Sequence, residues 1–141
     1  MAESIARAVA QELGMRDVEV TSAGTAAWEG APASDGALLV ALEHGADLSP
    51  HRARPVTPEL LAQHDLVLAM SPHHLERVEA LGARGKAFLL TTYATHGTSN
   101  RAVGDPFGGE LEAYRETYGE LQREVRRAFD RLAAERTPGR P

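Results

Sequence analysis

Two short apolar runs, DLVLAM at residues 65–70 and KAFLLT at residues 86–91, restrict the fold more than any other feature of the sequence. Both are too short for a buried helix and lack the polar alternation of a half-exposed strand, so they are predicted to be interior strands of a parallel sheet. A helix is expected between them, because Ser71 and Pro72 supply an N-cap residue followed by proline at the first helical position. This order predicts an α/β fold.

The remaining segments continue the alternation of helices and strands. Residues 18–25, VEVTSAGT, are predicted to form a further strand that runs into a glycine turn. In the helix that follows, Leu38, Leu39 and Leu42 are expected to form the apolar face. Helices are predicted over residues 4–14, 34–44, 58–63, 72–81 and 111–134. The predictions depend on the spacing of apolar residues, on N-cap residues or on a glycine that ends the helix. Residues 1–136 are expected to form one domain, and TPGRP at 137–141 a disordered tail.

The first predicted helix lacks a start. No Ser, Thr, Asp or Asn precedes it to accept its first N–H groups, and no strand leads into it. Chains of α/β proteins usually begin with a strand whose loop feeds the first helix, and ligands bind at the carboxyl end of such strands. We therefore expect the first strand of the sheet to be missing, and the sequence to be an N-terminally truncated form that starts at a methionine inside the domain.

Composition excludes several classes of function. The sequence contains no cysteine, which excludes disulfides, thiolate metal sites and a cysteine nucleophile among these residues. The net charge of −5 argues against broad nucleic-acid binding. There is no signal peptide and no run of about 18 apolar residues, so we expect a cytoplasmic protein without membrane contact.

Asp105 in the motif DPFGG is the most suggestive candidate for chemistry. A carboxylate held by the following proline, between a polar loop and a helix, suits a general acid. The alternative is a plain turn, because Asp-Pro followed by two glycines is common in loops.

Other candidates have stronger structural explanations. The six histidines lack the spacing of metal ligands, so no metal site is predicted, and the adjacent His73 and His74 are expected on different faces of a helix. Trp28, in a loop rich in Gly and Pro, either walls a pocket or caps the core. Arg52 and Arg54 either bind phosphate or form surface ion pairs, and we favour ion pairs. Ser22 has no recognisable base partner, which argues against a serine hydrolase.

Taken in order, the motifs MAE, SAGT, W-x-G, HRAR, DLVLAM, KAFLL-x-x-Y and DPFGG-x-x-x-x-Y resemble the low-molecular-weight protein tyrosine phosphatases from Met1 to about Leu132. The resemblance implies a three-layer sandwich with a central parallel sheet. It also implies a hydrophobic strand and a phosphate loop, Cys-x5-Arg-Ser-Pro, directly ahead of Met1. The cysteine of this loop forms a phosphocysteine and its arginine holds the phosphoryl group.

By the same resemblance Asp105 is the general acid and base, and Trp28 and Phe107 wall the substrate slot. The implied substrates are phosphorylated proteins or small phosphoesters, without a cofactor. Without the cysteine the present sequence is expected to be inactive. Loss of a central strand is expected to leave two strands without backbone partners, at a cost of many kcal/mol.

The sequence leaves several alternatives open. DLVLAM followed by DPFGG also resembles the protein-arginine phosphatases of the same family. Arsenate reductases share the fold but use further cysteines, so the absence of cysteine disfavours that activity. A non-catalytic remnant that binds a partner or an anion, and a fragment without function, are the remaining hypotheses. The oligomeric state is left open.

Overall fold

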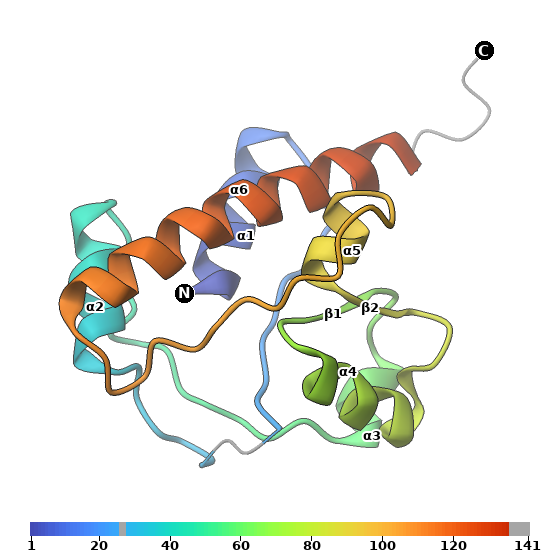
Figure 1. The fold of residues 1–141 in the computed structure, drawn as a ribbon, viewed down its shortest axis with the longest axis horizontal. Coiled ribbons are helices and arrows are strands. Elements are labelled where there is room, and N and C mark those ends of the chain that lie inside the picture. The colour runs from blue at the N-terminus through green and yellow to red at the C-terminus, as the bar shows by residue number, and fades with distance from the viewer. Residues whose placement is uncertain (26–27, 136–141) are drawn as a thin grey trace.

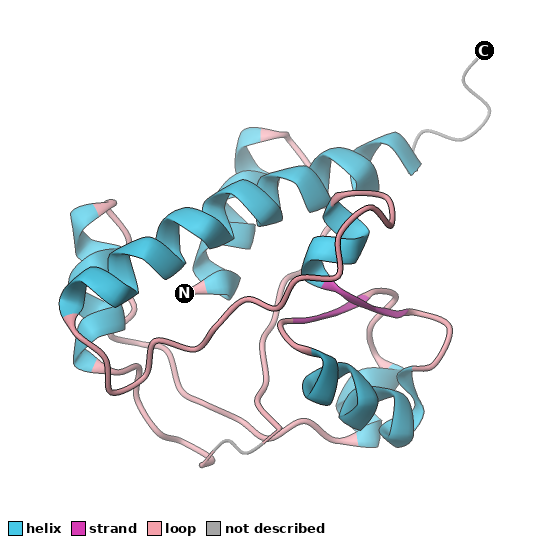
Figure 2. Ribbon diagram, in the orientation of Figure 1, coloured by secondary structure: helices cyan, strands magenta, loops and turns pink. Residues whose placement is uncertain are grey.

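The computed structural model describes residues 1–25 and 28–135, so the predicted tail at 137–141 lies outside the described residues. Helices cover both faces of a small parallel sheet, with α5 and α6 on one face and α3 and α4 on the other (Figure 1 and Figure 2). The elements are, in chain order, α1 (Ala2–Glu12), α2 (Asp35–Glu43), α3 (Pro58–Ala62), β1 (Val67–Ala69), α4 (Pro72–Val78), the π-helical turn η1 (Glu79–Ala83), β2 (Ala87–Leu89), α5 (Leu90–Ala94) and α6 (Leu111–Glu135).

The sheet confirms two parallel strands in these runs and the α/β class, but within the described residues each strand pairs only with the other, so neither is interior. Strands β1 and β2 pair in parallel, with Val67 opposite Ala87 and Ala69 opposite Leu89. The second strand ends at Leu89 rather than at Thr91, because the chain turns directly into helix α5. The sequence did not predict α5, since a short continuous apolar run does not distinguish a strand from the first turn of a buried helix.

The main core lies along one face of α6. The predicted spacing is confirmed, because Tyr114, Tyr118, Leu121, Val125 and Phe129 are all buried on this helix. They pack with buried residues of α1, α2 and α5 in one continuous cluster. Full burial of a large apolar side chain contributes about 1.5–3 kcal/mol, so this face accounts for much of the stability.

The buried face of α2 differs from the prediction. Leu39 and Leu42 are 52% and 59% exposed, whereas Val40 and its neighbour Ala41 are fully buried. The cause is close packing against α6, because a Cβ atom at Gly36 would lie only 2.4 Å from the Tyr114 ring. The small residues therefore face α6, and the leucines are turned outward.

The predicted strand over residues 18–25 is wrong. Val18 and Val20 are half-buried and alternate with exposed neighbours, as in a strand, but only Gly24 makes an isolated bridge, to Pro55. Within residues 1–25 and 28–135, the amides of residues 19–23 donate no backbone hydrogen bond, and Figure 2 draws the segment as a loop. An extended segment becomes a strand only when a neighbour pairs with it, and none does so in the part of the chain that the structure describes.

Candidate active site

The loop that carries Asp105 connects α5 to α6. Its residues 101–103, called the stem below, are fixed by hydrogen bonds. The Thr91 hydroxyl donates a hydrogen bond to the Arg101 carbonyl at 2.5 Å, and the Val103 amide donates to the Met70 carbonyl at 2.7 Å. Val103 is buried. These contacts attach the loop just after β1, at the edge of the sheet where α/β proteins bind their ligands.

The tip of the same loop is open to solvent. The Asp105 side chain accepts a hydrogen bond from the Phe107 amide through Oδ1 at 3.0 Å, and the Gly109 amide donates to the Pro106 carbonyl at 2.7 Å. Asp105 is exposed, and Phe107 is 78% exposed. The turn holds one carboxylate oxygen and leaves the other open, so Asp105 can exchange a proton with a bound molecule.

A cluster of Ser71, His73 and His74 lies directly after β1. The Nδ1 atoms of His73 and His74 are 2.9 Å and 2.8 Å from the Ser71 hydroxyl oxygen. Burial lowers the pKa of His74, and the charge of His73 lowers it further, while the charge of Asp105 acts in the opposite direction. The cluster lies beside the loop that carries Asp105, because Met70, directly before Ser71, accepts the hydrogen bond from the Val103 amide.

The prediction that His73 and His74 point to different helix faces is wrong. Both residues belong to the first turn of α4, where side chains fold back onto the N-cap residue Ser71. The Ser71 hydroxyl consequently contacts two imidazoles and makes no capping bond to the backbone. The motif SPHH directly after a buried strand was the sequence signal for this cluster.

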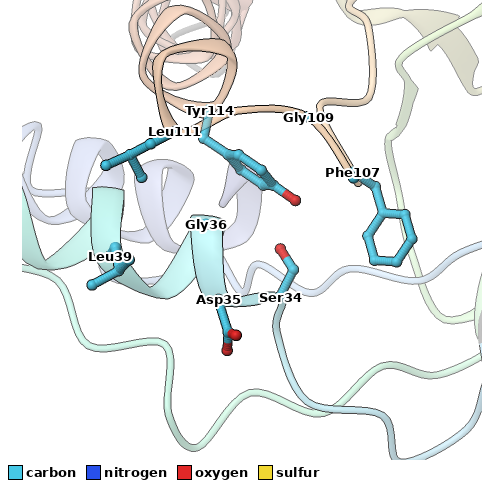
Figure 3. Close-up of a pocket in the computed structure, with 9 residues that line it drawn as sticks. Ser34, Asp35, Gly36, Leu39, Phe107, Gly109, Leu111 and Tyr114 are labelled. Carbon is cyan, nitrogen blue, oxygen red and sulfur yellow. The ribbon is translucent and has the colours of Figure 1, made fainter.

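A pocket of about 400 Å³ lies between the start of α2 and the tip of the Asp105 loop. Figure 3 shows the hydroxyls of Ser34 and Tyr114 pointing into the space beside Phe107. The lining residues are Ser34, Asp35, Gly36, Leu39, Phe107, Gly108, Gly109, Leu111 and Tyr114. The pocket adjoins Asp105 through the loop, but Asp105 does not line it.

The structure brings together only two of the three predicted site residues. Asp105 and Phe107 share one turn, whereas Trp28 lies in a separate loop and is 86% exposed. Within the described residues no hydrogen bond or ring contact joins Trp28 to either of them.

Arg52 and Arg54 do not form the predicted ion pairs within the described residues. Arg52 donates to the carbonyls of Ser49 and His51 at 2.8 Å and 2.7 Å, and Arg54 donates to the Ser22 carbonyl at 3.1 Å. Both side chains therefore hold backbone turns in place. Arg54 anchors the extended segment that follows α1.

The described residues contain no group of three or more His, Cys, Asp or Glu residues arranged to hold a metal ion. None of their helices is long and apolar enough to cross a membrane.

A family model matches almost the whole chain. The model of the low molecular weight phosphotyrosine protein phosphatases matches residues 1–137. The chain therefore belongs to this family.

The chain is similar to several protein phosphatases from bacteria. It is 34% identical to a protein-arginine-phosphatase of Bacillus subtilis over 138 residues, which are 96% of this chain and 89% of the relative. It is 32% identical to the low molecular weight protein-tyrosine-phosphatase Etp of Escherichia coli, over 82% of this chain and 77% of the relative. Among solved structures, the arginine phosphatase YwlE, a cysteine-to-serine mutant with a phosphorylated active site serine, matches with a TM-score of 0.84 and 33% identity, over 99% of this chain and 88% of that chain.

Proposed function

We propose that this chain is the acid-bearing part of a protein phosphatase that works through a phosphocysteine intermediate in the cytoplasm. The observation that carries the proposal is the position of Asp105, whose exposed carboxyl lies on a loop tied to the end of β1. In a parallel α/β sheet this edge is where a phosphate ester would bind. The family supports phosphorylated proteins or small phosphoesters as substrates.

The mechanism needs a thiolate and a cation that these residues do not supply, because the sequence contains no cysteine. We infer that a hydrophobic strand and a Cys-x5-Arg-Ser-Pro loop belong directly ahead of Met1. Within the described residues, the amides of residues 19–23 donate no backbone hydrogen bond and β1 pairs with β2 alone. Both observations support this inference, because an added strand could pair with these free backbone groups. A loop ending at the start of α1 would place its phosphate at a helix N-terminus.

The reaction then proceeds in two displacements. The thiolate attacks phosphorus, the bond from phosphorus to the leaving oxygen breaks, and the Asp105 carboxyl gives that oxygen its proton. In the second step the Asp105 carboxylate takes a proton from water, which attacks the phosphocysteine and releases phosphate and thiolate. The relative with a phosphorylated active site serine supports a covalent phosphoenzyme of this kind.

Phe107 and Trp28 are proposed as walls of the substrate slot. Phe107 follows Asp105 by two residues and presents an exposed ring beside it. Trp28 is also exposed, and we propose that its ring forms another wall of the same slot.

A second candidate substrate is phosphoarginine rather than phosphotyrosine. The relative described as a protein-arginine-phosphatase matches 138 residues, whereas the match to the tyrosine phosphatase Etp covers 118. With phosphoarginine the proton from Asp105 would go to the leaving guanidine nitrogen, and the other steps would be unchanged.

The proposal is tested with an extended chain, defined as this protein with the strand and the Cys-x5-Arg-Ser-Pro loop joined ahead of Met1. The extended chain is expected to hydrolyse p-nitrophenyl phosphate at mildly acid pH. The unextended chain is expected to be no faster than buffer. The matched control replaces the loop cysteine by serine and should abolish turnover.

Two results would contradict the proposal. Turnover by the unextended chain would show that no cysteine is needed, and an inactive but folded extended chain would remove the phosphatase assignment. The same extended chain, given a phosphotyrosyl and a phosphoarginyl peptide, decides between the two substrates by the larger kcat/KM.

A further inference from the structure

A single cation joins the stem of the Asp105 loop to α6. The Arg101 guanidinium forms ion pairs with Glu120 and Glu124, and its Nη2 atom lies 3.7 Å from Glu124 Oε1. The Arg101 carbonyl also accepts a hydrogen bond from the Thr91 hydroxyl. Arg101 is therefore fixed at its side chain and at its backbone, four positions before Asp105.

Glu124 is an unusual partner because it is buried. The residue is 3% exposed, and Arg127 donates a hydrogen bond to its Oε1 atom at 3.0 Å. Its Oε2 atom is buried and has no hydrogen-bond partner within the described residues. A buried carboxylate with one unpaired oxygen is costly, so nearby cations are strongly favoured. Glu124 thereby adds to the closer ion pair with Glu120 in keeping Arg101 against α6.

Within residues 1–25 and 28–135, the loop beyond the stem makes no comparable ion pair or hydrogen bond to another element. Gly104 is exposed, and a Cβ atom built there would meet no atom within 4 Å. The hydrogen bonds of the tip, from Phe107 to Asp105 and from Gly109 to Pro106, are local to it. The position of the Asp105 carboxyl therefore depends on where the stem is held.

We propose that Arg101, held by Glu124, is a positioning residue that sets the reach of the Asp105 carboxyl. This inference rests on the proposed function, because it gives Arg101 a role only through proton transfer by Asp105. A displacement of about 1 Å at a reacting group can cost roughly 10²-fold in rate. Arg101 itself contacts neither substrate nor leaving group.

The kinetic test compares two substrates of the extended chain. Phenolate is a poorer leaving group than p-nitrophenolate and depends more on a proton from Asp105. Arg101→Gln is expected to lower kcat/KM for phenyl phosphate by about tenfold and to lower it less for p-nitrophenyl phosphate. Arg101→Lys, which keeps the charge, should restore part of the loss.

Arg127→Gln is the matched control. It removes the other cation from the same Glu124 carboxylate but does not touch the loop. The kcat/KM values of this variant are expected to be unchanged for both substrates.

Amide hydrogen exchange in the unextended chain gives an independent readout. Arg101→Gln should speed exchange at Val103, whose amide donates to Met70, and leave exchange at Leu121 in the middle of α6 unchanged. This measurement needs no catalysis, so it reports on the attachment of the stem alone.

The outcomes separate the inference from the proposed function. Equal losses for the two substrates, or an Arg127→Gln effect equal to that of Arg101→Gln, would overturn the positioning role and leave the phosphatase assignment intact. If Asp105→Asn lowers kcat/KM for neither substrate, Asp105 is not the general acid. The positioning role of Arg101, which depends on that assignment, is then also wrong.

Discussion

The helices around α6 and the sheet with its neighbouring extended segment differ in how completely they are packed. Helices α1, α2, α5 and α6 share one large buried cluster, in which Val40 and Ala41 are fully buried. The second cluster, between the sheet and α3, α4 and η1, contains only Leu61, Val78, Ala83 and Ala87 as buried residues. In the DLVLAM run only Ala69 is buried, although an interior strand is usually buried on both faces.

Side-chain packing alone is therefore enough to stabilise the helical part, whereas the sheet also needs a further strand to pair with its backbone groups. Helices satisfy their backbone groups internally, so packing one face is enough. A strand needs a neighbour for every second N–H and C=O group. The proposed site lies on the incompletely paired part, next to the end of β1.

The largest effect concerns catalysis on the sheet side. Asp105→Ala in the extended chain should lower kcat for p-nitrophenyl phosphate by roughly 10²–10⁴-fold, because a general acid and base is lost. Glu116→Ala removes an exposed carboxylate from α6 and serves as the control, with an unchanged rate expected. A normal rate for Asp105→Ala would remove this residue from the mechanism.

The next effect concerns the helical core. Leu90→Ala should lower the free energy of unfolding of the unextended chain by about 2–5 kcal/mol, because Leu90 is 1% exposed and its truncation leaves a cavity. Urea unfolding followed by circular dichroism measures the change. A loss below that range would show that this core is looser than its burial indicates.

A smaller effect is expected for the equivalent truncation in the sheet. Leu68→Ala in the unextended chain should cost only about 1 kcal/mol, because Leu68 is half-buried in β1. The same substitution should cost more in the extended chain, where an added strand would cover it. An equal loss of unfolding free energy in the two chains would contradict the proposed difference in packing between the two regions.

The smallest effect is confined to alkaline pH. Burial, followed by the hydrogen bond to Glu135, raises the pKa of Tyr93 from 10.0 to about 12. The folded state thus favours the neutral phenol. The contribution of Tyr93 to the free energy of unfolding is therefore complete below pH 10 and is lost as the pH rises to about 12.

Tyr93→Phe should therefore weaken the fall in stability over this alkaline range. It should also cost about 1 kcal/mol at neutral pH, through loss of the 2.6 Å hydrogen bond to Glu135. Some alkaline sensitivity should remain, since burial also raises the pKa of Tyr118. Unfolding curves at a series of pH values provide the measurement, and an unchanged alkaline fall in the variant would contradict it.

The same contrast explains how much of the fold was predictable from the sequence. The long helix α6 was predicted within one residue because its pattern is local. The segment at 18–25 has the alternation of a strand, but its pairing depends on a neighbour that the pattern does not contain. The outward leucines of α2 depended on the contact between Gly36 and Tyr114, which lies outside the helix itself.

The candidate site divides in a similar way. Asp105 and Phe107 could be predicted as site residues because their motif is contiguous and its order resembles a known family, and their roles stay predictions. The convergence of His73 and His74 on Ser71 was missed because helical spacing alone separates adjacent residues. The attachment of Arg101 to Glu124 was missed because the two residues are distant in sequence.

Amide hydrogen exchange at two unpaired backbone edges, that of β1 and that of the extended segment 19–23, is the most direct test of the proposed missing strand. The measurement compares residues 19–23 and Leu68 in the unextended chain and in the extended chain with its loop cysteine changed to serine. We predict fast exchange at both edges in the unextended chain, and strong protection of both once the strand is present. Protection at these positions as strong as that of Leu121 in the unextended chain, or no gain from the added strand, would contradict the account.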